Sequence, residues 1–108
     1  MQTKQQVRNF DKGMYSFVRQ GTTGSLLNFS VNGRDIALPY SYITTLTFSY
    51  LKNGSERVHI RFGKLGVVDI WGLGLREVHK YIIDRIIRSI QPGYNEDTEI
   101  STIDIKIT

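Results

Sequence analysis

Residues 26–38 read LLNFSVNGRDIAL, and they give the clearest local structural signal in the chain. At its centre is Asn32-Gly33, the dipeptide that favours a two-residue type I′ turn between antiparallel strands. A two-residue turn fixes the cross-strand partners as Val31–Arg34, Phe29–Ile36 and Leu27–Leu38. The large apolar residues then share one face of both strands, so the turn and the side-chain pattern agree. The sequence therefore predicts a β-hairpin here.

A second hairpin is predicted over residues 45–62. Residues 45–50 and 56–62 each alternate between apolar and polar side chains, which is typical of a strand with one buried face. A two-residue turn at Asn53-Gly54 would mix the two faces, so we expect a loop with an odd number of residues. The cross-strand partners expected in this hairpin are Phe48–Ile60 and Leu46–Phe62.

Two shorter strands extend the expected sheet. One candidate covers residues 14–18, and the other covers residues 67–71 after a glycine-bounded turn. The apolar residues of the second candidate share a face with those of the preceding strand. This requirement sets two further expected pairs, Arg61–Asp69 and His59–Trp71.

Residues 75–91 carry apolar side chains at helical spacing and charged side chains on the opposite face. We expect this helix to end at Gln91, because Pro92-Gly93 follows. Further on, isoleucines alternate with polar residues over 103–107 and predict a final strand on a sheet edge. The expected fold is α+β: antiparallel β-hairpins form a sheet or half-open barrel, packed by one amphipathic helix near the C-terminus, with a short terminal strand.

The length of 108 residues indicates one domain. We expect a flexible lead-in over 1–12, a single domain over 13–95, and an acidic tail with an edge strand over 96–108. Residues 1–95 hold 13 Lys and Arg against 6 Asp and Glu, a net charge of +7, whereas residues 96–108 sum to −3. This asymmetry indicates an anionic partner for the body or a tail that docks on the body, unless it is ordinary solvated surface charge.

Several function classes are disfavoured by residue usage. With no cysteine, the chain has no disulfide, thiolate metal site or cysteine nucleophile. His59 and His79 are the only histidines, and neither lies in a nucleophile or metal-ligand motif. We therefore expect no enzyme, no metal and no cofactor. The polar start of the chain is unlike a signal peptide, and no apolar run could span a bilayer, so we expect a cytoplasmic protein.

Residues 38–46 read LPYSYITTL and resemble the segment that opens a strand in bacterial pleckstrin-homology-like domains. Those domains run through antiparallel hairpins and finish with a helix over one barrel mouth, as residues 25–91 would. The resemblance implies a half-open β-barrel, and it implies a binding or assembly role rather than catalysis.

The candidate ligand-binding site is the polar face of the second hairpin. Its members are Arg57, His59, Arg61 and Trp71, with Thr45, Thr47 and Ser49 beside them. Arginines offer forked donors to phosphate or carboxylate, and a tryptophan offers a plane for stacking. The alternative is the ordinary polar face of a half-solvated sheet, with Arg61 paired to Asp69 and Trp71 covered by the lead-in.

Two functions fit these expectations. The first is a small non-enzymatic interaction or assembly module that self-associates through an edge strand as a homo-oligomer or binds a protein partner. The second is a binder of an anionic ligand, such as a nucleotide, a phosphorylated headgroup or nucleic acid, through the basic and aromatic sheet face. An enzyme ranks last, because no acid, base and nucleophile constellation is visible.

Overall fold

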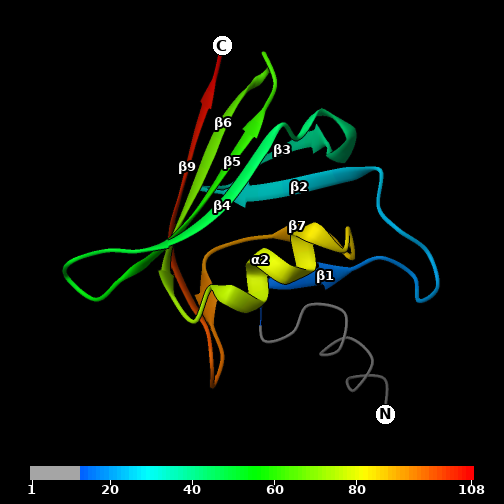
Figure 1. Cartoon of the computed structure of the whole chain (residues 1–108). Coiled ribbons are helices and arrows are strands. Elements are labelled where there is room, and N and C mark those ends of the chain that lie inside the picture. The colour runs from blue at the N-terminus through cyan, green and yellow to red at the C-terminus, as the bar shows by residue number, and fades with distance from the viewer. Residues whose placement is uncertain (1–12) are drawn as a thin grey trace.

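The computed structural model describes residues 13–108, which form two β-sheets that face each other across one core (Figure 1). In spatial order, the first sheet contains β1 (Tyr15–Phe17), β7 (Ile87–Ile90), β2 (Leu26–Val31) and β3 (Arg34–Pro39). The second sheet contains β4 (Thr45–Tyr50), β5 (Glu56–Phe62), β6 (Gly66–Leu73), β9 (Glu99–Ile107) and β8 (Gly93–Tyr94). A short 3₁₀ turn, η1 (Tyr40–Tyr42), links β3 to β4.

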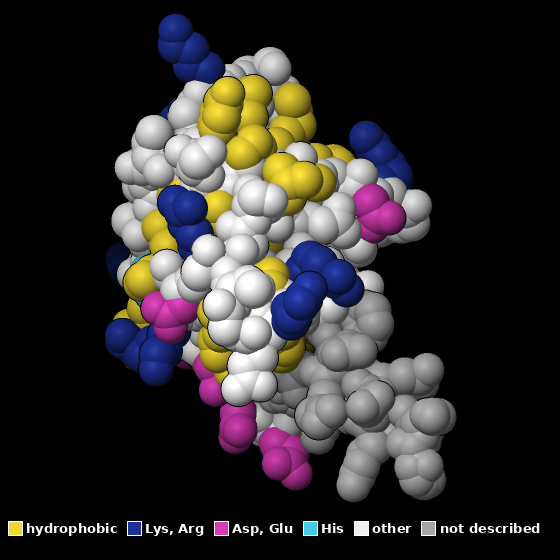
Figure 2. All heavy atoms as spheres, turned by 90° about the vertical axis from the view of Figure 1, so that its right-hand side faces the viewer, with side chains coloured by type: hydrophobic (Ala, Val, Ile, Leu, Met, Phe, Trp, Pro, Cys, Tyr) yellow, Lys and Arg dark blue, Asp and Glu magenta, His cyan; other side chains and the backbone are white. Residues whose placement is uncertain are grey.

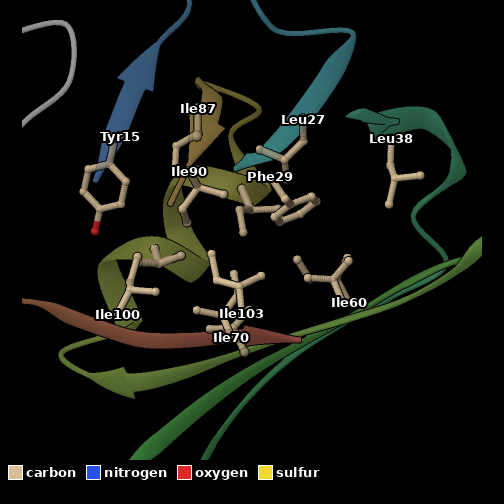
Figure 3. Close-up of a cluster of buried hydrophobic side chains, with 14 of the residues drawn as sticks. Tyr15, Leu27, Phe29, Leu38, Ile60, Ile70, Ile87, Ile90, Ile100 and Ile103 are labelled. Carbon is tan, nitrogen blue, oxygen red and sulfur yellow. The ribbon is translucent and has the colours of Figure 1, made fainter. Parts of the chain in front are cut away.

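Apolar side chains from both sheets fill the space between them (Figure 3). Phe29 of the first sheet meets Phe62 of the second edge to face, with ring centroids 6.1 Å apart. The helix α2 (Arg76–Ile83) adds Val78 and Ile82 to the same core. The two sheets and the helix therefore share one hydrophobic core.

The first hairpin forms with the predicted register. Val31 pairs with Arg34, Phe29 with Ile36 and Leu27 with Leu38. Asn32 and Gly33 both have positive φ, 51° and 78°, as a type I′ turn requires. On the outward side, hydrogen bonds from Ser30 and Asn28 hold the pKa of Asp35 below its usual value.

The second hairpin confirms the odd-length loop, over residues 51–55, but the predicted partners are wrong by two residues. The observed pairs are Phe48–Val58 and Leu46–Ile60. Within the loop, the Leu51 N–H donates to the Ser55 carbonyl at 2.9 Å, which sets Tyr50 opposite Glu56. A slip of two residues keeps every side chain on its predicted face.

The next pair of strands carries the same two-residue error. The predicted Arg61–Asp69 and His59–Trp71 pairs are wrong; the structure has Arg61–Val67, His59–Asp69 and Arg57–Trp71. The cause is a tight turn in which the Leu65 N–H donates to the Phe62 carbonyl at 2.9 Å. This turn places Phe62 opposite Gly66 and fixes the rest of the ladder.

The predicted helix over 75–91 is too long. It ends at Ile83, and Arg85 then adopts a left-handed φ of 56°. Residues 87–90 form β7 instead, parallel to β2 and antiparallel to β1. β-Branched isoleucines favour strands, and this segment finds backbone partners on both sides. Ile87 and Ile90 are fully buried there.

The predicted final strand is present as β9, nine residues long, and it pairs antiparallel with β6 of the same chain. Residues 13–108 form mostly antiparallel sheets with one short helix, and these sheets do not close into a barrel. No helix in this part of the chain is long and apolar enough to cross a membrane. The expected flexible lead-in over 1–12 lies outside the described residues, and the cytoplasmic location stays a prediction.

Candidate functional site

The predicted site lies on the outer face of the second sheet, which is the side turned away from the core. Cross-strand pairing arranges the side chains of β4, β5, β6 and β9 in three rows on this face. The rows are Ser49–Arg57–Trp71–Thr102, Thr47–His59–Asp69–Asp104 and Thr45–Arg61–Val67–Lys106. The alternation of each strand therefore brings the four predicted site residues to one face, as expected.

Asp69 is the centre of the contacts on this face. Its Oδ1 accepts hydrogen bonds from Arg57 Nε at 2.9 Å and from His59 Nδ1 at 2.8 Å. Arg57 Nη2 also lies 2.8 Å from this oxygen. The Asp69 side chain is only 13% exposed. Because a carboxylate oxygen can only accept, the contact with Asp69 requires a proton on Nδ1 of His59. Arg57 Nη2 also lies 3.2 Å from this Nδ1.

Arg57 also covers the indole of Trp71, with its guanidinium carbon 5.2 Å from the ring centroid. Arg57, His59 and Trp71 therefore form one cluster with Asp69. Arg61 is not in this cluster, because it lies one row away opposite Val67 and is exposed. Sequence reasoning missed the role of Asp69 because a register error of two residues assigned it to Arg61.

Few binding or catalytic roles are available to the residues of this cluster. Asp69 already compensates the charge of Arg57 and occupies its forked donors. Thr47 lies opposite His59, but no hydrogen bond joins these two described residues, so Thr47 is not held as a nucleophile for this histidine. Within residues 13–108, no group of three or more metal-ligating side chains gathers. The contacts of this cluster support a structural link between β5 and β6 rather than a reactive site.

A second feature is the open edge of β9. β8 pairs only with Glu99 and Ile100, and beyond Ile100 no described residue pairs with β9 on the side away from β6. The Thr108 N–H donates to the Leu65 carbonyl at 3.0 Å, in register with the β6–β9 ladder. In an antiparallel pair, the peptide groups of alternate residues point to the same neighbour.

This hydrogen bond fixes the direction of every peptide group in the regular part of β9. The N–H and C=O groups of the even-numbered residues, such as Asp104 and Lys106, face β6. Those of Ile103, Ile105 and Ile107 face the open side. The isoleucine side chains point to the core side of the sheet, where Ile103 is buried and Ile107 is 54% exposed.

A cleft of about 390 Å³ lies beside this edge, between β9 and the tip of the first hairpin. Its lining residues are Val31, Asn32, Arg34, Ile36, Ile103, Asp104, Ile105 and Ile107. Hydrophobic side chains gather at the upper end of the molecule in Figure 2, the end at which β9 terminates in Figure 1. Sequence reasoning missed the cleft, although the alternating isoleucines had indicated one of its walls.

No family model, curated protein or solved structure matches this chain. The resemblance to bacterial pleckstrin-homology-like domains therefore stays a prediction.

Proposed function

We propose that this chain is a small non-enzymatic interaction or assembly module that self-associates through the open edge of β9. The observation that carries the proposal is the direction of the peptide groups of Ile103, Ile105 and Ile107, which face the open side next to a cleft lined by both apolar and polar side chains. Unpaired N–H and C=O groups on an edge strand are a template for another strand. Strand addition is a recurring mode of recognition in which pockets take alternate side chains.

The sequence of β9 does little to prevent such pairing. Natural sheets protect their edges with proline, bulges, very short strands and charged side chains. Residues 102–107 contain no proline and pair regularly with β6, because the irregularity in register lies at the other end, next to Gly72. Asp104 and Lys106 are the charged residues here, and both belong to the rows of the outer face. This edge is therefore open to a partner strand.

Replacing Ile105 by proline tests the proposal. Proline has no N–H, but at this position the missing N–H would face the open side, so the β6–β9 ladder keeps its hydrogen bonds. We expect wild-type protein to associate as concentration rises, and Ile105→Pro to remain a folded monomer. Light scattering coupled to gel filtration measures mass, and circular dichroism measures folding.

Asp104→Pro is the matched control, because its lost N–H would have bonded to β6. We expect this variant to lose stability at all concentrations. Wild-type protein that stays monomeric at its highest soluble concentration would contradict self-association. Equal association of wild type and Ile105→Pro would show that the contact lies elsewhere.

A binder of an anionic ligand on the outer face is the second candidate. In its favour, Arg61 and Lys106 share a row, both are exposed, and neither forms an ion pair with a described residue. Trp71 adds an aromatic plane to the same face. Affinity for an anionic ligand that falls steeply with salt would favour this candidate, whereas self-association that persists at high salt without a ligand would favour the first.

A further inference from the structure

We infer that β9 pairs antiparallel with β9 of a second copy of this chain, about a two-fold axis through Ile105. The inference rests on the proposed self-association and specifies its partner and register. The axis sets Ile105 opposite the partner's Ile105, Ile103 opposite the partner's Ile107, and Asp104 opposite the partner's Lys106. In a two-fold interface each contact occurs twice, once in each direction.

Backbone geometry favours this register. Ile103, Ile105 and Ile107 all direct their peptide groups to the open side. With the axis at Ile105, each of these residues lies opposite another member of the same set. Each opposed pair can then exchange both of its hydrogen bonds, as alternate pairs in an antiparallel ladder do. Every peptide group that is unpaired on this edge from Ile103 to Ile107 gains a partner.

Charge on the outer face favours the same register. Asp69 and Asp104 lie directly opposite each other in the β6–β9 pair, an arrangement of like charges that destabilises a sheet. Asp69 is compensated by Arg57. Asp104 forms no ion pair within the described part of the chain. The axis at Ile105 places the partner's Lys106 next to Asp104 and supplies the missing cation.

Other registers lack this match. An axis through Ile103 sets Asp104 opposite the partner's Thr102 and brings the partner strand toward β8, which already occupies the edge at Glu99 and Ile100. An axis through Ile107 pairs Lys106 with the partner's Thr108. Any one-residue slip would turn the isoleucines of one copy to the outer face of the other.

The apolar side of the strands also fits. Ile107 is 54% exposed, and the axis at Ile105 would cover it with the partner's Ile103. These side chains lie on the cleft side of the sheet, where Val31 and Ile36 form the other wall. Pairing would bring the two clefts together beneath a sheet continuous across both copies.

Exchanging the charges tests the register. Asp104→Lys and Lys106→Asp each place like charges opposite one another at both symmetric positions, so each should weaken dimerisation by about tenfold. The double variant Asp104→Lys/Lys106→Asp restores opposite charges, and its dissociation constant should return to the wild-type value. Sedimentation equilibrium measures these constants, and Thr47→Lys on distant β4 controls for added positive charge.

A mixture of the two single variants gives a second readout. In a heterodimer of Asp104→Lys with Lys106→Asp, both cross-strand pairs have opposite charges. Native mass spectrometry should therefore find the heterodimer in excess over either homodimer. A wild-type dimer whose affinity all these variants retain would overturn the register and leave self-association intact. A monomeric wild type would overturn both.

Discussion

One carboxylate oxygen of Asp69 accepts hydrogen bonds from two side chains of the neighbouring strand, Arg57 and His59. Arg57 in turn stacks on Trp71 of the strand that carries Asp69. The cluster therefore crosses the β5–β6 pair in both directions. A residue at such a crossing contributes to sheet stability whether or not the face binds a ligand.

Asp69→Asn should lower the free energy of unfolding by about 1 kcal/mol, since it replaces charge-assisted hydrogen bonds by neutral ones at a site partly open to solvent. Urea denaturation at low and high salt measures the loss. Asp104→Asn is the matched control in the same row: at a concentration where the protein is monomeric, it removes an unpaired charge opposite Asp69, so we expect no loss. Equal destabilisation by both changes would contradict the importance of the Asp69 cluster.

The same variant separates the two candidate functions. Asp69→Asn frees the guanidinium of Arg57, so an anion-binding face should bind a polyphosphate more tightly in this variant and more weakly in Arg57→Ala. If neither of these changes nor Arg61→Ala alters the binding of polyphosphate, the anionic-ligand candidate loses its support.

At the scale of single elements, some local sequence patterns determine the register of a hairpin, and others leave the register or the type of element open. Asn32-Gly33 fixes both the turn type and the loop length, so the register of the first hairpin follows from sequence. For the second hairpin, the sequence predicts only that the loop has an odd number of residues. This places each side chain on the correct face of the sheet, but it does not determine the cross-strand partners, which were predicted incorrectly. The isoleucines after Ile83 match both a helical stripe and a buried strand, and only their position between β1 and β2 decides between the two.

The corrected end of α2 gives a prediction with an internal control. Ile82 is 1% exposed and its neighbour Ile83 is 57% exposed. We expect Ile82→Ala to cost about 2–5 kcal/mol of unfolding free energy, because it removes packed methyl groups and leaves a cavity. Ile83→Ala should change stability by about 0.5 kcal/mol or less. Chemical denaturation of both variants tests this, and equal effects would mean that the helix is rotated from its described orientation.

At the scale of the whole molecule, the two candidate surfaces were not equally predictable. The outer face follows from alternation along each strand, so Arg57, His59, Arg61 and Trp71 could be placed together from sequence. The cleft needs the tip of the first hairpin to meet β9 across the core. No local pattern encodes that meeting of distant segments, because it depends on how the two sheets pack.

Amide exchange gives the most direct view of the edge of β9, because its two sets of peptide groups should behave differently. The N–H groups of Asp104 and Lys106 point to β6 within the chain, so we expect slow exchange at every protein concentration. Those of Ile103, Ile105 and Ile107 point to the open side, so they should exchange rapidly in dilute protein and slowly in concentrated protein. Residue-resolved exchange measured by NMR over a dilution series tests this alternation.

In Asp104→Lys the slow exchange of the isoleucines should require a higher protein concentration, since the variant weakens pairing between two copies without changing the peptide groups of the isoleucines. Slow exchange of both sets at a concentration where the protein is monomeric would mean that the edge is already paired within one chain. That result would remove the basis for a second copy at this edge.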